Sequence, residues 1–295
     1  MEEKKSWTCL SSFVIKLIAF LTMTIDHVGW MLEVNVGGNY IIAVIFRYIG
    51  RLALPLFCFM IAEGMIHTKK AGNYLLRLGI MATLISAGFI FIHYSPYFPG
   101  FNIRNQGNIF IDLLLGALAI LALKQKQWYL KILAIIPFGI TVASFIVTCL
   151  EFGEGMIIHW FPFFLRPQYH FYSVGMIVLF YVAHYLKNIF LGNYSKKTGI
   201  PVESLTDTQI ERKALNLISF GMLVFATLVF FIVGLSIPYD YLYWGPGMQN
   251  MAILSGAFIL LYNGKRGYNA KWFQYGSYFY YPIHLIIIFA IGLLI

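Results

Sequence analysis

The chain has 295 residues, of which 60% are hydrophobic and only 11% are charged. A soluble globular domain carries about 25% charged residues, so the composition excludes an ordinary soluble protein. Apolar stretches of about 20 residues recur from end to end, and each can cross about 30 Å of hydrocarbon as a helix. We therefore expect an all-α fold, a polytopic transmembrane helix bundle that forms a single integral membrane domain over residues 1–295.

About nine spans are predicted, which in chain order cover residues 12–32, 41–65, 74–94, 109–123, 130–150, 171–191, 214–236, 248–263 and 277–294. The span at 109–123 is short, so a re-entrant or tilted segment is the alternative there. Losing this span would move the lysines of 124–131 to the other side of the membrane, against the charge distribution.

The basic residues predict the orientation. With the N-terminus inside, 16 of the 21 lysines and arginines lie in or beside inner segments, and only Arg104 and Arg166 lie in outer loops. Because cytoplasmic loops carry such an excess, we expect the N-terminus inside and the C-terminus outside. The net charge of +9 then reflects topology, and no nucleic-acid partner is expected. We expect membrane lipid as a partner and a cell membrane, the bacterial inner or cytoplasmic membrane, as the location.

The first predicted span, in the stretch KLIAFLTMTIDHVGW, carries Lys16, Asp26 and His27. Ionisable groups at membrane depth are costly, which points to function. Lys16 and His27 are eleven residues apart. They therefore share a helix face and are separated by about 16 Å along the axis. The structural alternative is that Lys16 reaches the interface and His27 bonds a neighbouring helix.

The second predicted span carries Arg47 and Arg51, one turn apart on one face. In an antiparallel hairpin with the first span, Asp26 has the depth to pair with Arg47, and this pair can be purely structural. Arg51 has no obvious partner in the sequence, which makes it the stronger functional candidate.

Four further polar residues are candidates with plain structural explanations. Glu63 lies at the cytoplasmic end of its span, where a lysine just beyond the span can pair with it. Asn108 and Asp112 lie one turn apart at the outer end of the fourth span, and Asn108 is a natural helix cap. His284 follows Pro282 at the start of the last span and suits an interfacial hydrogen bond. The three cysteines are scattered singly, so no metal site is predicted.

Four blocks of the sequence resemble, in this order, the blocks of the TraX family. They are KLIAFLTMTIDHVGW, GRLALPLFCFMIAEGMIHTKKAGNYLLRLGI, GNIFIDLLLGALAI and FYYPIHLIII. The resemblance is dense in the first 120 residues and at the C-terminus. TraX is associated with N-terminal acetylation of pilin in conjugation. The family also resembles the wider transmembrane acyltransferase superfamily, whose first helix carries a basic residue, ten intervening residues and a histidine.

Lys16 and His27 match that spacing. The resemblance therefore implies a membrane acetyltransferase that uses cytosolic acetyl-CoA as acyl donor and no metal. It implies a donor-binding role for Lys16 and a catalytic role for His27. Asp26 and Arg51, which stand out as charged residues within the spans, are further catalytic candidates. The acceptor is left open between a peptide, a glycan and a lipid.

Two other classes compete with this interpretation. A proton-coupled transporter also buries Asp, His and Arg in its helices, but it usually has internal repeats and paired broken helices. The sequence shows neither. A purely structural membrane subunit would have little use for three cationic groups within its spans.

Overall fold

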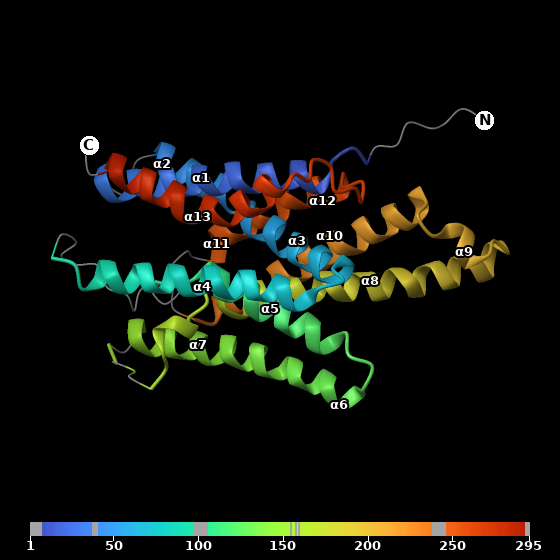
Figure 1. The fold of residues 1–295 in the computed structure, drawn as a ribbon, viewed down its shortest axis with the longest axis horizontal. Helices are drawn as coiled ribbons and strands as arrows, with labels where there is room; N and C mark the ends of the chain where they lie inside the picture. The colour runs from blue at the N-terminus through green and yellow to red at the C-terminus, as the bar shows by residue number, and fades with distance from the viewer. Residues whose placement is uncertain are drawn as a thin grey trace. The chain divides into compact units, whose positions relative to one another are not determined.

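The computed structural model describes residues 8–36, 41–96, 106–153, 155–156, 158, 160–237 and 246–292. Within them every regular element is a helix, apart from an isolated bridge between Leu10 and Tyr262 (Figure 1). The predicted all-α fold is confirmed. Arg104 and the last two residues of the predicted span at 277–294 lie outside the described residues.

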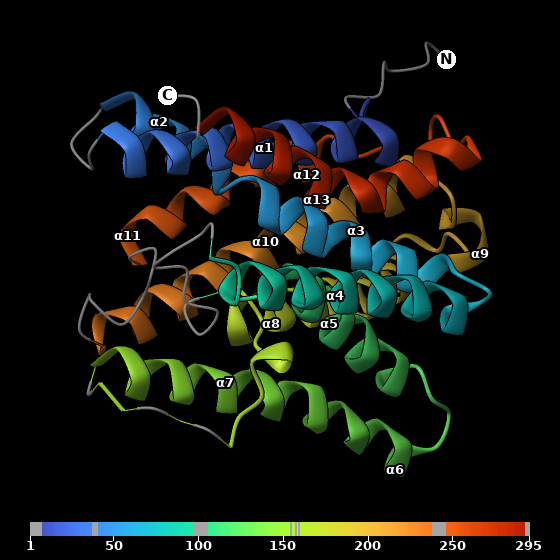
Figure 2. The same cartoon turned by 60° about the vertical axis from the view of Figure 1, so that its left-hand side comes forward.

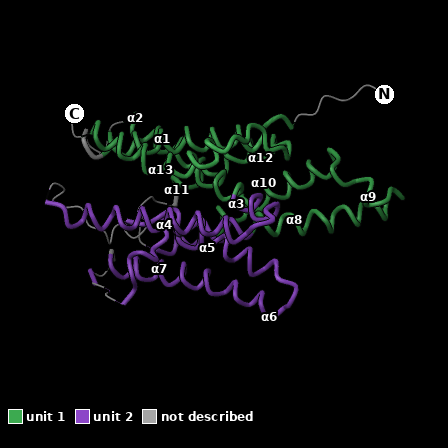
Figure 3. The backbone as a smooth tube through the Cα atoms, in the orientation of Figure 1, with its two compact units in different colours: residues 1–60, 179–231, 247–295 green, residues 61–178, 232–246 purple. Residues whose placement is uncertain are grey.

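The chain divides into two compact units, each built from separate stretches of sequence (Figure 3). Unit 1 contains residues 1–60, 179–231 and 247–295, and unit 2 contains residues 61–178 and 232–246. Four helices contribute to both units, namely α3 (Ala53–His67), α8 (His170–Thr198), α10 (Gln209–Leu235) and α11 (Pro246–Gln249). A single membrane domain over residues 1–295 stays a prediction.

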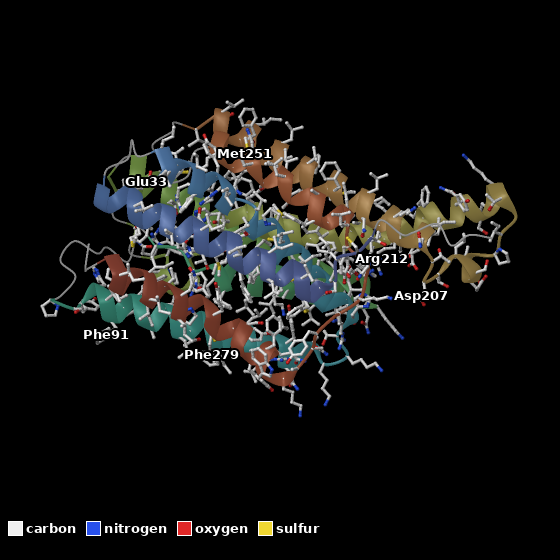
Figure 4. All side chains as sticks on the ribbon, turned by 90° about the horizontal axis from the view of Figure 1, so that it is seen from above. Glu33, Phe91, Asp207, Arg212, Met251 and Phe279 are labelled. Carbon is white, nitrogen blue, oxygen red and sulfur yellow. The ribbon has the colours of Figure 1, made fainter. Side chains whose placement is uncertain are left out.

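Unit 1 is organised around the first helix. Its elements are α1 (Ser12–Val36), α2 (Ile41–Gly50), the first half of α3 (Ala53–His67), the end of α8 (His170–Thr198), α9 (Val202–Leu205), most of α10 (Gln209–Leu235), α11 (Pro246–Gln249), η5 (Asn250–Ser255), α12 (Gly256–Leu260) and α13 (Lys271–Gly292). Helix α1 packs against both α2 and α13 (Figures 1 and 2). In Figure 4, Glu33 of α1 and Arg212 of α10 lie well apart from each other within unit 1.

Unit 2 surrounds a short, buried helix. Its elements are the end of α3, α4 (Ala71–His93), α5 (Ile109–Leu123), α6 (Trp128–Lys131), η2 (Ile132–Ala134), α7 (Ile135–Gly153), η3 (Phe163–Leu165), the start of α8 and the end of α10. Helix α5 packs against α4 and α7, and nine of its 15 residues are buried. A helix of this length spans about 22 Å, less than the hydrocarbon thickness. Neighbouring helices therefore shield much of α5.

The predicted polytopic bundle is confirmed. Seven described helical segments are long and apolar enough to cross a membrane: Ser12–Glu33, Ile41–His67, Ala71–His93, Trp128–Glu151, Phe163–Thr198, Gln209–Leu235 and Lys271–Gly292. The other two predicted spans correspond to the shorter apolar helices Ile109–Leu123 and Gly247–Leu260. Full crossing by these two stays a prediction.

The second predicted span is interrupted, which the sequence analysis did not anticipate. Helix α2 ends at Gly50 and α3 begins at Ala53, so Arg51 lies in the break. Pro55 lacks the N–H that would bond the carbonyl of Arg51 in a continuous helix, and its ring crowds the preceding turn. The eighth span is also irregular, because its central part is the 3₁₀ helix η5. The described structure thus contains a helix break at Arg51.

Contacts within each unit agree with the predicted sides of the membrane. In unit 1, the backbone N–H of Ser12 donates to the carbonyl of Lys265 over 2.9 Å, which joins two segments predicted to be cytoplasmic. In unit 2, Lys124 Nζ donates to the carbonyl of Met65 over 2.7 Å, again between predicted cytoplasmic ends. The relative orientation of these helices thus matches the charge distribution.

Candidate functional site

The seam between α1 and α13 carries the first candidate residues. Near the start of both helices, Lys16 Nζ lies 5.5 Å from the ring centroid of Phe273. Further along, the rings of Phe20 and Tyr280 stack with centroids 4.4 Å apart. Residue numbers increase together along the two helices, so α1 and α13 run parallel. Lys16 is partly buried, with its ammonium group over an aromatic face.

Two histidines meet deeper in this seam. His27 Nδ1 lies 2.6 Å from His284 Nε2, and the two rings stack with centroids 4.9 Å apart and an interplanar angle of 20°. His284 Nδ1 lies 2.8 Å from the carbonyl oxygen of Tyr280. A bond from Thr24 Oγ1 to the Tyr280 hydroxyl, 2.7 Å long, joins the same helices one turn away. Both histidines are candidates from the sequence, but their contact was not predicted.

Asp26 faces a different neighbour, the hairpin helix α2. Its Oδ2 accepts from Arg47 Nη1 over 2.8 Å, so the predicted Asp26–Arg47 pair is confirmed. Its Oδ1 accepts from Arg51 Nη2, so the prediction that Arg51 lacks a partner is wrong. The physical reason is that one carboxylate has two oxygens and can accept from two guanidinium groups on one face. Asp26 and His27 are adjacent in sequence but point to different helices, as expected from their angular separation.

Asp26, Arg47 and Arg51 form a group that we call the Asp26 cluster. Its positive charge is balanced only if a second acidic residue contributes. Glu33 Oε2 lies 3.6 Å from Arg47 Nε, but the Glu33 side chain is 41% exposed. The side chains of Asp26, Arg47 and Arg51 are at most 10% exposed. The buried part of the cluster therefore holds two cations and one anion. The sequence analysis had not assigned Glu33 to it.

Two glycines allow α1 and α2 to come this close. A Cβ atom at Gly50 would overlap the carboxylate of Asp26, and one at Gly29 would lie 2.8 Å from the Cβ of Phe46. Small residues at helix contacts permit close backbone approach in membrane proteins. The tight hairpin brings both arginines within reach of one carboxylate.

In unit 2, Asn108 acts as the predicted helix cap. Its Oδ1 accepts from the backbone N–H of Phe110 over 3.0 Å. Its Nδ2 donates to the carbonyl of Ala82 over 2.8 Å and to Ser86 Oγ over 3.0 Å, which ties the start of α5 to α4. Asn108 is thus fully occupied by structural hydrogen bonds.

Asp112, completely buried, holds the start of α8. Its oxygens accept from the backbone N–H groups of Gln168, over 2.5 Å, and Tyr169, over 3.0 Å, and from the hydroxyl of Ser173. A carboxylate suits a helix N-terminus, where backbone donors lack helical partners and the dipole is positive. These partners lie more than 50 residues away in sequence, which hid this role from sequence analysis.

Two other acidic residues of unit 2 lie in the part of the chain that the structure describes. Glu63 is buried, with Oε2 3.7 Å from His67 Nε2. Glu151 forms a bidentate pair with Arg166, with N···O distances of 2.5 and 3.0 Å, which the sequence analysis missed. Glu63, Asn108 and Asp112 therefore belong to unit 2, whereas Lys16, the histidine pair and the Asp26 cluster belong to unit 1. Among the described residues, no three His, Cys, Asp or Glu side chains are grouped so as to hold a metal ion.

The helices and these buried groups define a multi-pass helical membrane protein with an imidazole pair and an ion cluster inside one helical unit. The family model of the TraX protein matches residues 11–223. The chain therefore belongs to the TraX family, as the sequence blocks predicted.

A comparison with curated proteins finds a relative across nearly the whole length. The chain is 25% identical over 281 residues to "Probable fimbrial assembly protein FimC, serogroup H1" of Dichelobacter nodosus, which covers 94% of each chain. No solved structure matches. Helix α13 with His284 lies beyond the residues that the family model matches.

Proposed function

We propose that this protein is an integral membrane acetyltransferase. It moves an acetyl group from cytosolic acetyl-CoA to an acceptor at or beyond the bacterial cytoplasmic membrane. The observation that carries the proposal is the contact between His27, eleven residues beyond Lys16, and the buried His284 in the α1–α13 seam. The motif shared with the transmembrane acyltransferase superfamily supports it.

The donor enters from the cytoplasmic end of the seam. Lys16 contacts a phosphate of CoA, because an ammonium group and a phosphate form a charge-assisted hydrogen bond. The flexible arm of CoA then extends inward along α1. His27, about 16 Å further along the helix axis, meets the thioester at its end.

The chemistry at His27 needs one imidazole nitrogen with a lone pair. The acceptor hydroxyl or amine attacks the thioester carbonyl carbon, and the carbon–sulfur bond breaks as the new bond forms. His27 takes the proton of the acceptor and returns it to the CoA thiolate, so the products are acetylated acceptor and CoA. In the two-step form His27 attacks the thioester carbonyl carbon first, and the carbon–sulfur bond breaks to release CoA thiolate. The acceptor then attacks the acetyl-imidazole, its proton passes to the thiolate, and the bond between the acetyl group and His27 breaks.

The Asp26 cluster supplies positive charge near the same level of α1. Because Arg47 and Arg51 share one buried carboxylate, their joint charge exceeds that of Asp26. We assign the cluster, rather than Arg51 alone, to stabilisation of the developing oxyanion. Its second role is to hold α2 against α1, which fixes the helix that carries His27.

A pilin-like peptide is the acceptor class that we favour. The TraX family is associated with pilin acetylation, and the Dichelobacter nodosus relative carries a fimbrial assembly name. Glycan and lipid acceptors are the competing classes. Mass spectrometry of surface pilins, glycans and lipids from cells with and without the gene identifies the acceptor, because the acceptor lacks its acetyl group in cells without the gene.

Isothermal titration of the purified protein with CoA tests the proposal itself. We expect saturable binding that also occurs in His27→Ala and in the control variant His93→Ala, which changes a histidine in unit 2. Absence of CoA binding by the wild-type protein would refute the acetyltransferase.

A proton-coupled transporter is the second candidate, favoured by the helix break at Arg51. Broken helices at membrane depth form ion and substrate sites in transporters. A transporter predicts proton flux in liposomes without acetyl-CoA. The acetyltransferase predicts CoA binding and no such flux.

A further inference from the structure

We propose that His284 is a positioning residue that selects the reactive nitrogen of His27. It holds His27 in the form that carries hydrogen on Nδ1 and leaves the lone pair on Nε2. Its importance for catalysis rests on the proposed acetyltransferase function, but the protonation pattern itself can be measured without any transfer reaction.

The backbone of α13 fixes the tautomer of His284. His284 Nδ1 lies 2.8 Å from the carbonyl oxygen of Tyr280. A carbonyl oxygen only accepts hydrogen bonds, so His284 Nδ1 carries the hydrogen and donates it. In a neutral imidazole the other nitrogen is then an acceptor, which assigns the lone pair of His284 to Nε2.

The tautomer of His284 then determines the tautomer of His27 on α1. His27 Nδ1 lies 2.6 Å from His284 Nε2. Because His284 Nε2 accepts, His27 Nδ1 donates, and the lone pair of His27 lies on Nε2. The hydrogen bonds of the described residues engage only Nδ1 of His27. Nε2 is therefore available to take a proton or to attack a thioester.

A charged His284 would reverse this assignment, since both of its nitrogens would donate. The surroundings disfavour it. His284 is only 6% exposed, and none of the ion pairs among the described residues includes it. A buried imidazolium without a carboxylate partner is unfavourable, so His284 is neutral.

The local sequence explains why His284 is held so firmly. Pro282 lies inside α13, where it cannot donate a helical hydrogen bond and its ring distorts the preceding turn. In that turn the side chain of His284 donates to a carbonyl of its own helix. The ring also stacks on Tyr280, with centroids 5.2 Å apart. The acceptor atom Nε2 is thus fixed towards α1.

The His27–His284 hydrogen bond resembles the one that orients the histidine of a catalytic triad. In a Ser-His-Asp triad an acceptor on Nδ1–H fixes the imidazole tautomer and stabilises the imidazolium that forms during the reaction. Here a second imidazole, anchored on a carbonyl, is that acceptor. The competing explanation is that His284 only joins two helices, as polar residues often do in membranes.

Thr24 provides a matched control for that explanation. Its bond to the Tyr280 hydroxyl joins the same two helices one turn from the histidines. Thr24→Val removes a seam hydrogen bond without touching either imidazole. A purely structural role predicts similar effects for Thr24→Val and His284→Leu, whereas a positioning role predicts a large effect only for His284→Leu.

Solid-state NMR of the full-length protein in liposomes, with ¹⁵N-labelled histidine, tests the assignment directly. The His27 signals are identified by their loss in His27→Gln. We expect protonated Nδ1 and bare Nε2 on His27 in the wild type and in Thr24→Val, and a shift towards protonated Nε2 in His284→Leu. Protonated Nε2 on His27 in the wild type would overturn the inference.

Transfer kinetics supply the second readout. We expect His284→Leu to lower acetyl transfer on the order of 10²-fold or more with unchanged CoA binding, because tautomer control underlies acid–base catalysis. His284→Glu keeps an acceptor for Nδ1–H and should recover most of the loss. Equal losses in His284→Leu and Thr24→Val would overturn the positioning role. An inactive wild-type protein with the expected spectrum would refute the acetyltransferase and support the tautomer assignment.

Discussion

The polar groups of the two units differ in which of their side-chain atoms have hydrogen-bond partners. In unit 2, Asn108 and Asp112 are occupied by backbone N–H groups, carbonyls and hydroxyls at helix ends. In unit 1, a chain of hydrogen bonds from Tyr280 through His284 ends at His27 Nδ1, and none of the described hydrogen bonds uses Nε2 on the same ring. Both sets look alike in the sequence, as polar residues in apolar spans. Asn108 and Asp112 thus complete helix ends, whereas the His27 imidazole is oriented by one nitrogen and keeps the other available for reaction.

The largest effect on stability is expected in unit 1, at Asp26. Asp26→Ala removes the shared partner of two buried guanidinium groups, and breaking a buried ion pair costs about 3–5 kcal/mol. The midpoint of thermal unfolding in detergent should therefore fall strongly. Arg47→Leu combined with Asp26→Leu should be less destabilised than Asp26→Ala, because fewer buried charges remain unpaired. A double variant as unstable as the single one would show that the pair is not the stabilising unit.

Asp112 in unit 2 should be the next most sensitive position. Asp112→Ala leaves buried backbone donors at the start of α8 without their acceptor, and each unsatisfied group costs about 1–3 kcal/mol. Asp112→Asn keeps one acceptor oxygen and should lose less. Both variants should retain CoA binding once folded, as measured by titration at a temperature below unfolding. Loss of binding in well-folded Asp112→Asn would give this residue a functional role and weaken the contrast between the units.

Lys16 should show a smaller effect, confined to the donor. Removing one charge-assisted phosphate contact costs about 1.5–3 kcal/mol, on the order of tenfold to a hundredfold in CoA affinity. Lys16→Ala should therefore raise the dissociation constant for CoA and recover turnover at saturating donor. Lys213→Ala changes an exposed lysine in α10 and serves as the control. Equal loss of affinity in both variants would indicate general surface charge and not a phosphate contact.

The topology can be checked without any assay of function. Reporters after residues 127 and 197 should be cytoplasmic, and one near residue 160 should be external, because of the lysine and arginine distribution. An external reporter at 127 would mean that α5 does not cross the membrane. The predicted number of spans would then be wrong.

The sequence was sufficient for features that depend on neighbouring residues. Apolar length located the helical segments, and α5 begins and ends where it was predicted. Helical periodicity and hairpin depth were enough to pair Asp26 with Arg47. The break at Arg51 was also readable in principle, because Pro55 removes a helical donor from that turn.

Features that depend on distant helices could not be read in this way. His27 and His284 are 257 residues apart, and the periodicity of one helix does not say which remote helix it packs against. Asp112 likewise finds its partners in the residues before and within the start of α8. Arg51 was misjudged for another reason, since counting one partner per charge ignores that a carboxylate accepts from two sides.

The rate of acetyl transfer by His27→Ala tests the central claim most directly. Purified wild-type and variant proteins in liposomes are given saturating labelled acetyl-CoA and a pilin-like peptide, with CoA binding measured on the same samples. A positioned acid–base group contributes about 10²–10⁴-fold, so the variant should lose that much transfer and keep its affinity for CoA. Transfer by His27→Ala at the wild-type rate would contradict the account.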